Sequence, residues 1–297
     1  MRRIPAIAIV ALAALLSAAA TTVGPVIGAE RATPIPDLTG AWARTTFALE
    51  PPVSGPGPLF NPSRQRRNVV PAYTNPILTP EGAKVVRERY ESTQAGKPYG
   101  TPSSTCWPSV APMIYRVQEM ALLQQKDQVT IVYMQDHEVR RVRMNAEHPA
   151  RVTPTWHGDS IGHYEGDTLV IDTIGAIVGP VNVIDGAGSP YSDALHVIER
   201  YRLVDFEVAK EARDRNVRVN GPPGTNQAAA IDPDYMGKGL QVEFRVEDPK
   251  IFKTPWSGIA TYSKADALWT ENVCAENTFE YYNNRDTLLP VAARPDF

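Results

Sequence analysis

The histidines of this chain gather in one region. All five of them fall within a stretch of 60 residues: His137, His148, His157, His163 and His196. Histidine is the side chain that most readily changes charge near neutral pH, so it is the usual residue for moving protons there. The stretch 137–196 is therefore the first candidate region for a functional site.

A carboxylate in the same region raises a second possibility. The segment 194–203 alternates in polarity, which predicts a strand whose core-facing side includes Glu199. Burying an ionised and unpaired carboxylate costs several kcal/mol. Glu199 must therefore pair with a cation or take a raised pKa, and a raised pKa would suit a proton donor or base near pH 7. A structural pair with Arg141 or Arg143 of a neighbouring strand is the alternative.

Together these residues suggest acid–base chemistry without a cofactor. His163 and Glu199 would exchange protons with the substrate. Asp159 would orient or charge-stabilise a histidine, and His196 would assist from the edge of the strand. On a regular strand His196 and Glu199 point to opposite faces, so both reach one site only if a β-bulge intervenes. The expected reaction is an isomerisation, elimination, hydration or hydrolysis.

A metal-dependent enzyme is the alternative. His157 and Asp159 have His-x-Asp spacing, and in an extended chain they share one side with His163. Two histidines and a carboxylate can hold one face of a metal ion and leave other positions open for substrate. His163 or His196 would be the third ligand. We therefore expect no cofactor, with a divalent metal as the alternative.

The run 158–162 matches the pattern Gly-x-Ser-x-Gly, centred on Ser160. That pattern marks the nucleophile of a serine hydrolase only where a strand meets a helix. Here a turn at 165–167 and another strand follow. We therefore expect a glycine-rich bend whose serine hydroxyl bonds to the backbone.

The elements that must position these residues are mostly short strands. Polarity and β-propensity predict strands at 38–42, 129–133, 139–144, 168–173, 194–203, 240–246, 259–263 and 268–273. Helices are predicted only at 79–94 and 205–216. With 27 prolines and 20 glycines among 297 residues, the composition also argues against a helical bundle. We therefore expect a mainly β fold, an antiparallel lipocalin-like barrel or folded-over sheet with a few short helices and long Pro-rich loops.

The chain divides into three regions by composition. Arg2 and Arg3 precede an apolar run and then small residues, which is typical of a signal peptide spanning 1–29. A single membrane anchor is the alternative. Residues 30–125 form a Pro-rich segment with the first strand and one helix. Residues 126–297 form the main antiparallel β region with an inserted loop at 217–238, and we expect both to belong to one domain.

Export has consequences for charge and for the cysteines. Removing residues 1–29 takes away two arginines, so the 30 basic and 33 acidic residues become 28 and 33, a net charge of −5. Such a chain lacks the basic excess needed to bind nucleic acid, and no stable membrane insertion is expected after cleavage. Cys106 and Cys274 are expected to form one disulfide in the periplasm or outside the cell. Two buried free thiols are the alternative.

Longer matches give a resemblance to known proteins. The stretch 156–173 resembles the signature W-x-G-D-S-[VI]-G-H-[WY]-E-G-D-T-L-V-[VI]-D-T of a family of exported bacterial proteins, and further matched segments extend the resemblance over about residues 36–297. Residues 40–42 also resemble the Gly-x-Trp of lipocalin-like barrels. The family resemblance implies a mostly β fold and no particular reaction. It places family motif residues at Asp159, His163, Glu165, Asp167, His196 and Glu199.

These observations predict an exported β-barrel that binds a small, mostly apolar or aromatic molecule. Such a ligand would suit the aromatic side chains Trp42, Trp156, Tyr164, Tyr201, Trp256 and Tyr262, if they line a pocket. The barrel would then act on its ligand by the acid–base chemistry described above. The alternatives are the metal-dependent enzyme and a non-catalytic carrier or envelope protein.

Overall fold

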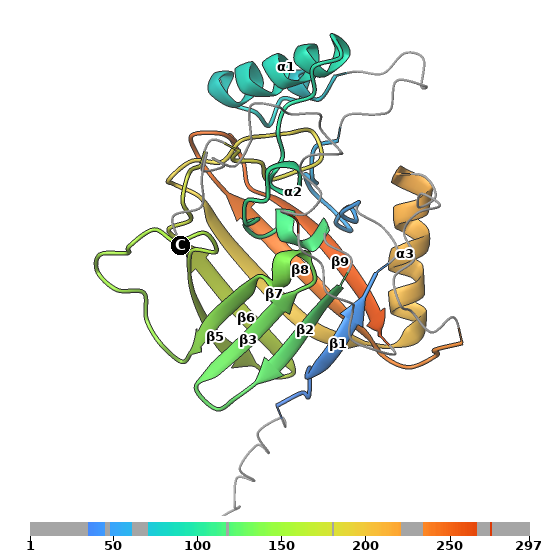
Figure 1. Ribbon diagram of the computed structural model, residues 1–297. Coiled ribbons are helices and arrows are strands. Elements are labelled where there is room, and N and C mark those ends of the chain that lie inside the picture. The colour runs from blue at the N-terminus through green and yellow to red at the C-terminus, as the bar shows by residue number, and fades with distance from the viewer. Residues whose placement is uncertain are drawn as a thin grey trace, which may run out of the picture. The chain divides into compact units, whose positions relative to one another are not determined.

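The chain folds into a closed barrel of nine strands (Figure 1). The structure is a computed structural model that describes residues 35–44, 48–60, 71–116, 119–179, 181–220, 234–265 and 274. The chain divides into two units, residues 1–32 and 33–297, and every element described below belongs to the second. The predicted signal peptide, the predicted strand at 268–273 and most of the predicted loop at 217–238 lie outside the described residues.

The strands follow one another around the barrel in chain order, and β1 closes it by pairing with both β2 and β9. They are β1 (Gly40–Ala43), β2 (Glu119–Gln124), β3 (Gln128–Tyr133), β4 (Val139–Met144), β5 (Asp159–Glu165), β6 (Thr168–Ile174), β7 (His196–Val204), β8 (Gly239–Glu247) and β9 (Trp256–Lys264). The mainly β, barrel-forming fold predicted from the sequence is therefore confirmed.

Neighbouring strands are antiparallel with one exception, the parallel pair β4–β5. A parallel pair needs a connection that returns along the barrel, and residues 145–158 provide it. The strand β5 lies where the sequence predicts a glycine-rich bend. Gly162 permits this, because a Cβ there would lie 2.9 Å from the Val142 side chain and 3.0 Å from that of Met144.

Three α-helices accompany the barrel. The helix α1 (Pro80–Gln94) has the predicted bounds, and the Thr79 side chain caps it by accepting a hydrogen bond from the Gly82 amide. The helix α3 (Phe206–Asn220) begins where predicted but continues four residues beyond 216. The short α2 (Pro102–Thr105) and the 3₁₀ helices η1 (Ala72–Thr74), η2 (Met113–Arg116) and η3 (Gln135–His137) complete the set.

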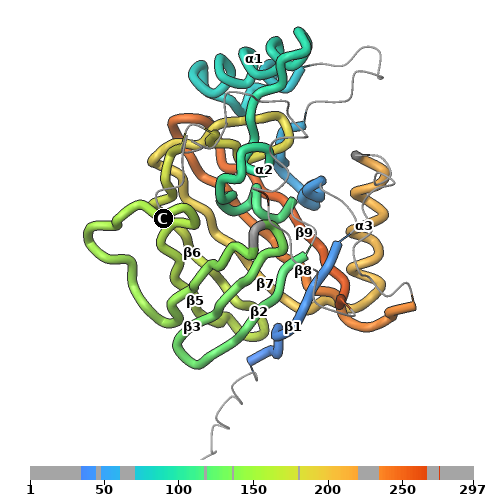
Figure 2. The backbone as a smooth tube through the Cα atoms, in the orientation of Figure 1, coloured from blue at the N-terminus to red at the C-terminus, as the bar shows by residue number. Residues whose placement is uncertain are grey.

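The two ends of the barrel differ in how they are covered. Most of the long connections meet at one end, called here the loop end: those joining β1 to β2, β6 to β7 and β8 to β9, together with the last residues of 145–158. The helices α1 and α2 belong to the first of these connections (Figure 2). Isolated bridges such as Phe60↔Gly186 and Leu78↔Phe252 tie the connections to one another. The loop end is therefore a built cap of several chain segments.

The centre of this cap is η2, which brings Tyr115 into the barrel. Arg44 donates a hydrogen bond of 2.9 Å to the Tyr115 carbonyl oxygen and forms a buried ion pair of 3.1 Å with Glu50. Glu50 in turn accepts hydrogen bonds from the backbone and side chain of Thr261 in β9. Buried polar contacts thus fasten η2 to the barrel wall.

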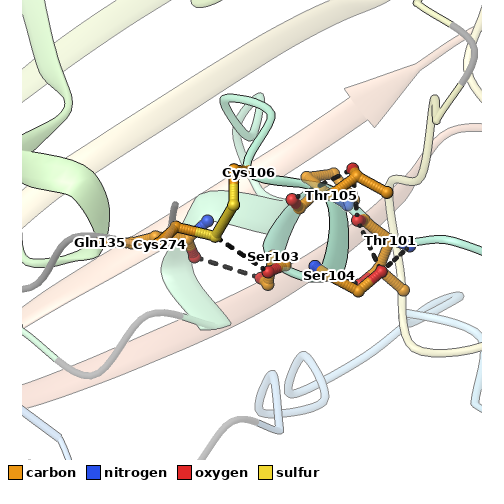
Figure 3. The surroundings of a disulfide bond; sticks show 8 residues. Thr101, Ser103, Ser104, Thr105, Cys106, Gln135 and Cys274 are labelled. Carbon is orange, nitrogen blue, oxygen red and sulfur yellow. Dashed lines mark hydrogen bonds between the residues drawn. A yellow bond between two sulfur atoms is a disulfide. The ribbon is translucent and has the colours of Figure 1, made fainter. Parts of the chain in front are cut away.

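A disulfide links Cys106 to Cys274 (Figure 3). Cys106 ends α2, whose start is capped reciprocally by Thr101 and Ser104. The Ser103 hydroxyl donates a 3.1 Å hydrogen bond to Gln135 of η3. The disulfide pairing predicted from the sequence is therefore present, and it ties the chain at residue 274 to the cap.

The opposite end of the barrel has the short β2–β3 and β5–β6 turns, and also the longer connection from β7 to β8, which contains α3. The turn Glu165-Gly166-Asp167 joins β5 to β6, as predicted. The Gln124 amide donates a 2.6 Å hydrogen bond to the Tyr164 hydroxyl across this end. None of the helices in the described ranges has the length and apolar character needed to cross a bilayer.

Candidate functional site

The barrel interior contains a buried ion pair between Arg140 of β4 and Glu199 of β7. The Arg140 guanidinium donates to both carboxylate oxygens, at 2.9 Å from Nη1 to Oε1 and in close contact from Nη2 to Oε2. The side chains are 2% and 0% exposed. The predicted burial of Glu199 is thus confirmed, whereas the suggested partners Arg141 and Arg143 are wrong.

Two tyrosine hydroxyls complete the surroundings of the carboxylate. Tyr201, also on β7, donates to Glu199 Oε1 at 3.0 Å. Tyr115 reaches the same oxygen from η2, and its hydroxyl lies 2.6 Å from that of Tyr201. The carboxylate therefore receives hydrogen bonds from a strand on one side and from the cap on the other.

Two further hydroxyls, those of Ser160 and Thr173, accept hydrogen bonds from Arg140. Its Nε donates to Ser160 at 3.1 Å, its Nη2 donates to Thr173 at 2.6 Å, and the two hydroxyls lie 3.0 Å apart. Ser160 is thus part of a strand and bonded to a guanidinium. It does not lie at a strand-to-helix turn, so the structure supports the sequence-based rejection of a serine nucleophile.

Complete burial raises the pKa of the Glu199 carboxyl to about 8, against the opposing effect of the hydrogen bond from Tyr201. Burial disfavours the charged form because the interior solvates it poorly. The Arg140 guanidinium also opposes this rise in pKa, because a positive neighbour favours the charged carboxylate. A carboxyl in this range can give or take a proton near neutral pH.

The hydroxyl of Tyr133 lies beside this cluster. Burial raises its pKa, against the positive charge of Arg140 and side-chain hydrogen bonds with Arg140 and Tyr201. The Tyr133 hydroxyl therefore belongs to the same set of buried polar groups. We call Tyr115, Tyr133, Arg140, Ser160, Thr173, Glu199 and Tyr201 the interior cluster.

His157 lies at the loop end, next to the interior cluster. Its ring packs against that of Tyr133, with centroids 6.2 Å apart, and its Nε2 lies 3.5 Å from Glu138. Burial and the positive charge of Arg140 lower the pKa of His157 to about 4. The ring is therefore neutral at physiological pH and can accept a proton only weakly.

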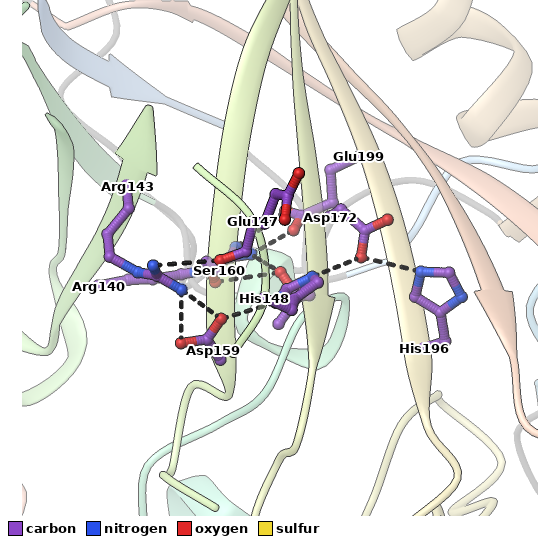
Figure 4. A network of polar contacts seen from close by, with 10 residues as sticks. Arg140, Arg143, Glu147, His148, Asp159, Ser160, Asp172, His196 and Glu199 are labelled. Atoms are coloured by element: carbon purple, nitrogen blue, oxygen red, sulfur yellow. Dashed lines mark hydrogen bonds and ion pairs between the residues drawn. The ribbon is translucent and has the colours of Figure 1, made fainter. Parts of the chain in front are cut away.

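A second polar network runs over the outer face of the barrel (Figure 4). The His148 Nδ1 lies 2.6 Å from Asp159, and its Nε2 lies 3.1 Å from Asp172. Asp172 also meets the Nε2 of His196 at 2.9 Å, and Arg143 contacts both oxygens of Asp159 at 2.7 and 2.9 Å. These five residues are called the outer chain.

The protonation of the outer chain follows from its contacts. The hydrogen bond with Asp172 raises the pKa of His196 against the effect of burial. Burial alone would raise the pKa of Asp172, but its hydrogen bonds with His196 and His148 outweigh burial and lower it. The two ring nitrogens of His148 each face a carboxylate, so the ring links Asp159 to Asp172 and through it to His196.

The structure separates the residues that the sequence suggested for catalysis. Asp159 and His196 are joined through His148 and Asp172 on the outer face, whereas Glu199 lies inside. His163 is on the outer face of β5, exposed, and 3.2 Å from Glu165. His163 and Glu199 thus lie on opposite faces of the sheet, and no bulge brings His196 inward beside Glu199, because the register of β7 against β6 is continuous.

The suggested metal ligands are separated as well. His157 faces Glu138 at the loop end, Asp159 is held by Arg143 and His148, and His163 contacts Glu165. Within the part of the chain that the structure describes, no group of three or more His, Cys, Asp or Glu side chains could hold a metal ion.

Three important residues were not singled out from the sequence. Arg140 shares its strand parity with Val142 and Met144, and this alternation is the signal that places it inside. Tyr115 lies in a segment with no clear period, and His148 lies in a connection. No local pattern indicates the contacts of these two residues, which depend on the folding of distant segments.

Comparison with known proteins adds no assignment. The chain matches no protein-family model, no curated protein and no solved structure.

Proposed function

We propose that the barrel binds a small, mostly apolar or aromatic molecule in its interior, from the loop end, and acts on it by acid–base chemistry at Glu199. No cofactor takes part in the proposed chemistry. The location is supported by the loop end, where several long connections meet over the interior cluster. Connections of this kind often carry binding residues on a rigid scaffold.

The observation that carries the proposal is the state of Glu199. A fully buried carboxyl whose pKa is raised to about 8 is suited to exchange a proton at physiological pH. Apolar residues can often replace a whole buried ion pair at little cost in stability, so stability alone does not require the Arg140–Glu199 pair. The position of Glu199 beneath the cap, where Tyr115 reaches it from η2, supports a role with a ligand.

The neighbours of Glu199 have complementary roles in this proposal. Arg140 and the hydroxyl of Tyr201 would stabilise negative charge as it develops on the substrate or on the carboxylate. The aromatic side chains of Phe244 and Trp256, whose rings lie 6.0 Å apart, provide apolar surface for a flat molecule. This set of groups suits isomerisation, elimination, hydration or hydrolysis.

The proposal is tested with a dye and one conservative variant. Anilinonaphthalene sulfonate is titrated into the protein, and a panel of small aromatic and apolar compounds is screened for displacement of the dye. Compounds that displace it are then followed by NMR for chemical change at pH 6 to 9. Glu199→Gln is expected to retain binding and to lose turnover by at least about 100-fold, the usual contribution of a positioned acid or base.

A matched control separates the two faces of the sheet. His163→Ala alters an exposed residue on the outer face and is expected to keep both binding and turnover. If compounds bind but none is converted, and Glu199→Gln binds them unchanged, the protein is a non-catalytic carrier instead. If Glu199→Gln converts a substrate at the rate of the natural protein, the assignment of Glu199 is refuted.

The proposal includes export to the periplasm or the outside of the cell. It is supported by the basic and apolar start of the chain and by the Cys106–Cys274 disulfide, since disulfides persist in oxidising compartments. Expression of the full chain followed by cell fractionation and N-terminal sequencing tests it. The expected product begins at Glu30 outside the cytoplasm, and an uncut chain in the cytoplasmic fraction would contradict it.

A further inference from the structure

The barrel interior contains the phenol ring of Tyr115, a residue that belongs to none of the barrel strands. The ring enters from η2 in the cap and is fully buried. Every other member of the interior cluster lies on a strand. The Tyr115 ring therefore enters the interior from the loop end and occupies it in the way that a bound small molecule would.

The hydroxyl of this ring is recognised by two polar groups. It bonds to the carboxylate of Glu199 and lies 2.6 Å from the hydroxyl of Tyr201. Both partners come from β7 and are completely buried. A guest without a hydroxyl at this point would leave the Glu199 carboxylate short of one hydrogen bond, which is costly in the interior.

The face and edge of the ring are recognised by aromatic side chains. The Tyr201 ring meets it edge-on, with centroids 6.4 Å apart at 73°, and the Phe244 ring lies 5.8 Å away at 31°. Trp256 packs against the far side of Phe244. Such arrangements favour an aromatic guest over an aliphatic one.

We propose that this place is a phenol subsite, which Tyr115 fills in the present structure, and that the ligand is a molecule with a hydroxylated aromatic ring that displaces it. The inference rests on the proposed function and names the chemical class of its ligand. The displaced segment is a single short 3₁₀ helix. Its withdrawal breaks the hydrogen bond from Arg44 to the Tyr115 carbonyl oxygen but no strand pairing, so binding can proceed without unfolding the barrel wall.

Competition between Tyr115 and the ligand is the property to measure. The probes are 4-propylphenol and propylbenzene, which differ by the hydroxyl, and the affinities are determined by isothermal titration calorimetry. Tyr115→Phe removes the hydroxyl that competes for Glu199 while retaining the ring. We expect 4-propylphenol to bind this variant about tenfold more tightly than the natural protein, because one competing hydrogen bond corresponds to about that factor.

Tyr191→Phe is the matched control. Its hydroxyl also donates a hydrogen bond, partly buried, to the Ile177 carbonyl oxygen at 2.9 Å, outside the interior cluster. This variant should bind 4-propylphenol as the natural protein does. An equal gain in both variants would show a general loosening of the fold and would overturn the inference.

A second variant tests the subsite without requiring the ligand to displace the Tyr115 ring. Tyr115→Ala vacates the space of the ring, and we expect it to bind 4-propylphenol at least tenfold more tightly than propylbenzene. Equal affinity for the two probes, with no effect of Tyr115→Phe, overturns the phenol subsite but leaves the proposed interior ligand site and the role of Glu199 standing. Conversely, unchanged turnover in Glu199→Gln defeats the proposed function and leaves the phenol subsite intact.

Discussion

The interior cluster and the outer chain are built from the two faces of the same strands. Strand β4 contributes Arg140 to the interior and Arg143 to the outside, and β7 contributes Glu199 and His196 in the same way. Both networks pair an arginine and a carboxylate, yet the interior pair is 2% and 0% exposed whereas Arg143 and Asp159 are 46% and 22% exposed. The chemical groups of the two pairs are similar, but their exposure to solvent differs.

This difference shows that burial decides what an ion pair does. On the outside, water screens the charges, so the pairs contribute little. Inside, the same contacts act without competing water. Each change of protonation therefore has a large energetic effect there, and this makes Glu199, and not the outer carboxylates, the group suited to chemistry.

The largest expected effect comes from breaking the interior pair on one side. Arg140→Ala leaves the Glu199 carboxyl buried without its cation, which should lower the free energy of unfolding by about 3–5 kcal/mol. The loss should grow as the pH rises and the carboxyl ionises. Urea denaturation at pH 6 and pH 9 measures it.

A double replacement sharpens this result. Arg140→Met combined with Glu199→Leu removes both charges and keeps apolar volume, so it should be far less destabilising than Arg140→Ala alone. If the double variant is as unstable as Arg140→Ala, the ion pair is required for packing. Its presence would then no longer support a chemical role for Glu199.

The next effect is a pH dependence specific to the interior. The pKa of Glu199 is about 8 in the folded protein, above its ordinary value of 4.5. Between these values the folded state binds one more proton than the unfolded state, so the stability contributed by this group falls as the pH rises from about 5 to 8. The natural protein should therefore lose stability relative to Glu199→Gln over this window in thermal denaturation, and parallel curves would contradict the assignment.

A smaller effect is expected from the centre of the outer chain. Asp172→Asn removes the partner that raises the pKa of His196. A raised histidine pKa contributes stability that is present below the unfolded value and is lost as the pH rises through the folded one. The variant should thus lose stability near pH 5.5 and lose less at pH 8.5. The loss near pH 5.5 should be about 1 kcal/mol or less, because the side chains of His196 and Asp172 are about one-third exposed. A loss that is equal at both pH values would exclude the charged histidine.

The smallest effect is expected at the edge of the outer chain. Arg143→Gln breaks the exposed contact with Asp159 and should cost about 0.5 kcal/mol or less. In 1 M NaCl the difference should vanish, since the Debye length falls to about 3 Å. The same salt should leave the Arg140→Ala penalty nearly unchanged, and equal salt sensitivity would remove the contrast between the two networks.

Much of the fold could be predicted because it follows from local pattern. Polarity and β-propensity located β3, β4, β6, β7 and β8, and Thr79-Pro80-Glu81 located the start of α1. Alternating polarity along 194–203 predicted that Glu199 is buried. Where glycines interrupt the alternation, as in β5, the sequence predicts a bend instead of a strand, because the packing that stabilises this strand comes from Val142 and Met144 on another strand.

The candidate site could be predicted only in part. Strand parity shows which face a residue occupies, but it does not show which residue faces it across a closed barrel. Arg140 pairs with Glu199 although their strands are not neighbours, and Tyr115 arrives from a separate connection. Such contacts arise from barrel closure, so spacing along the chain could not reveal them.

The ionisation of Glu199 tests the central claim most directly. Carbon-13 NMR of the side-chain carboxyl, assigned by its absence in Glu199→Gln, follows the group from pH 4 to 10. We predict a titration near pH 8, which would establish a proton-exchanging acid inside the barrel. A carboxyl that stays ionised down to pH 4.5 would instead show a permanent structural ion pair with Arg140 and would contradict the proposed chemistry.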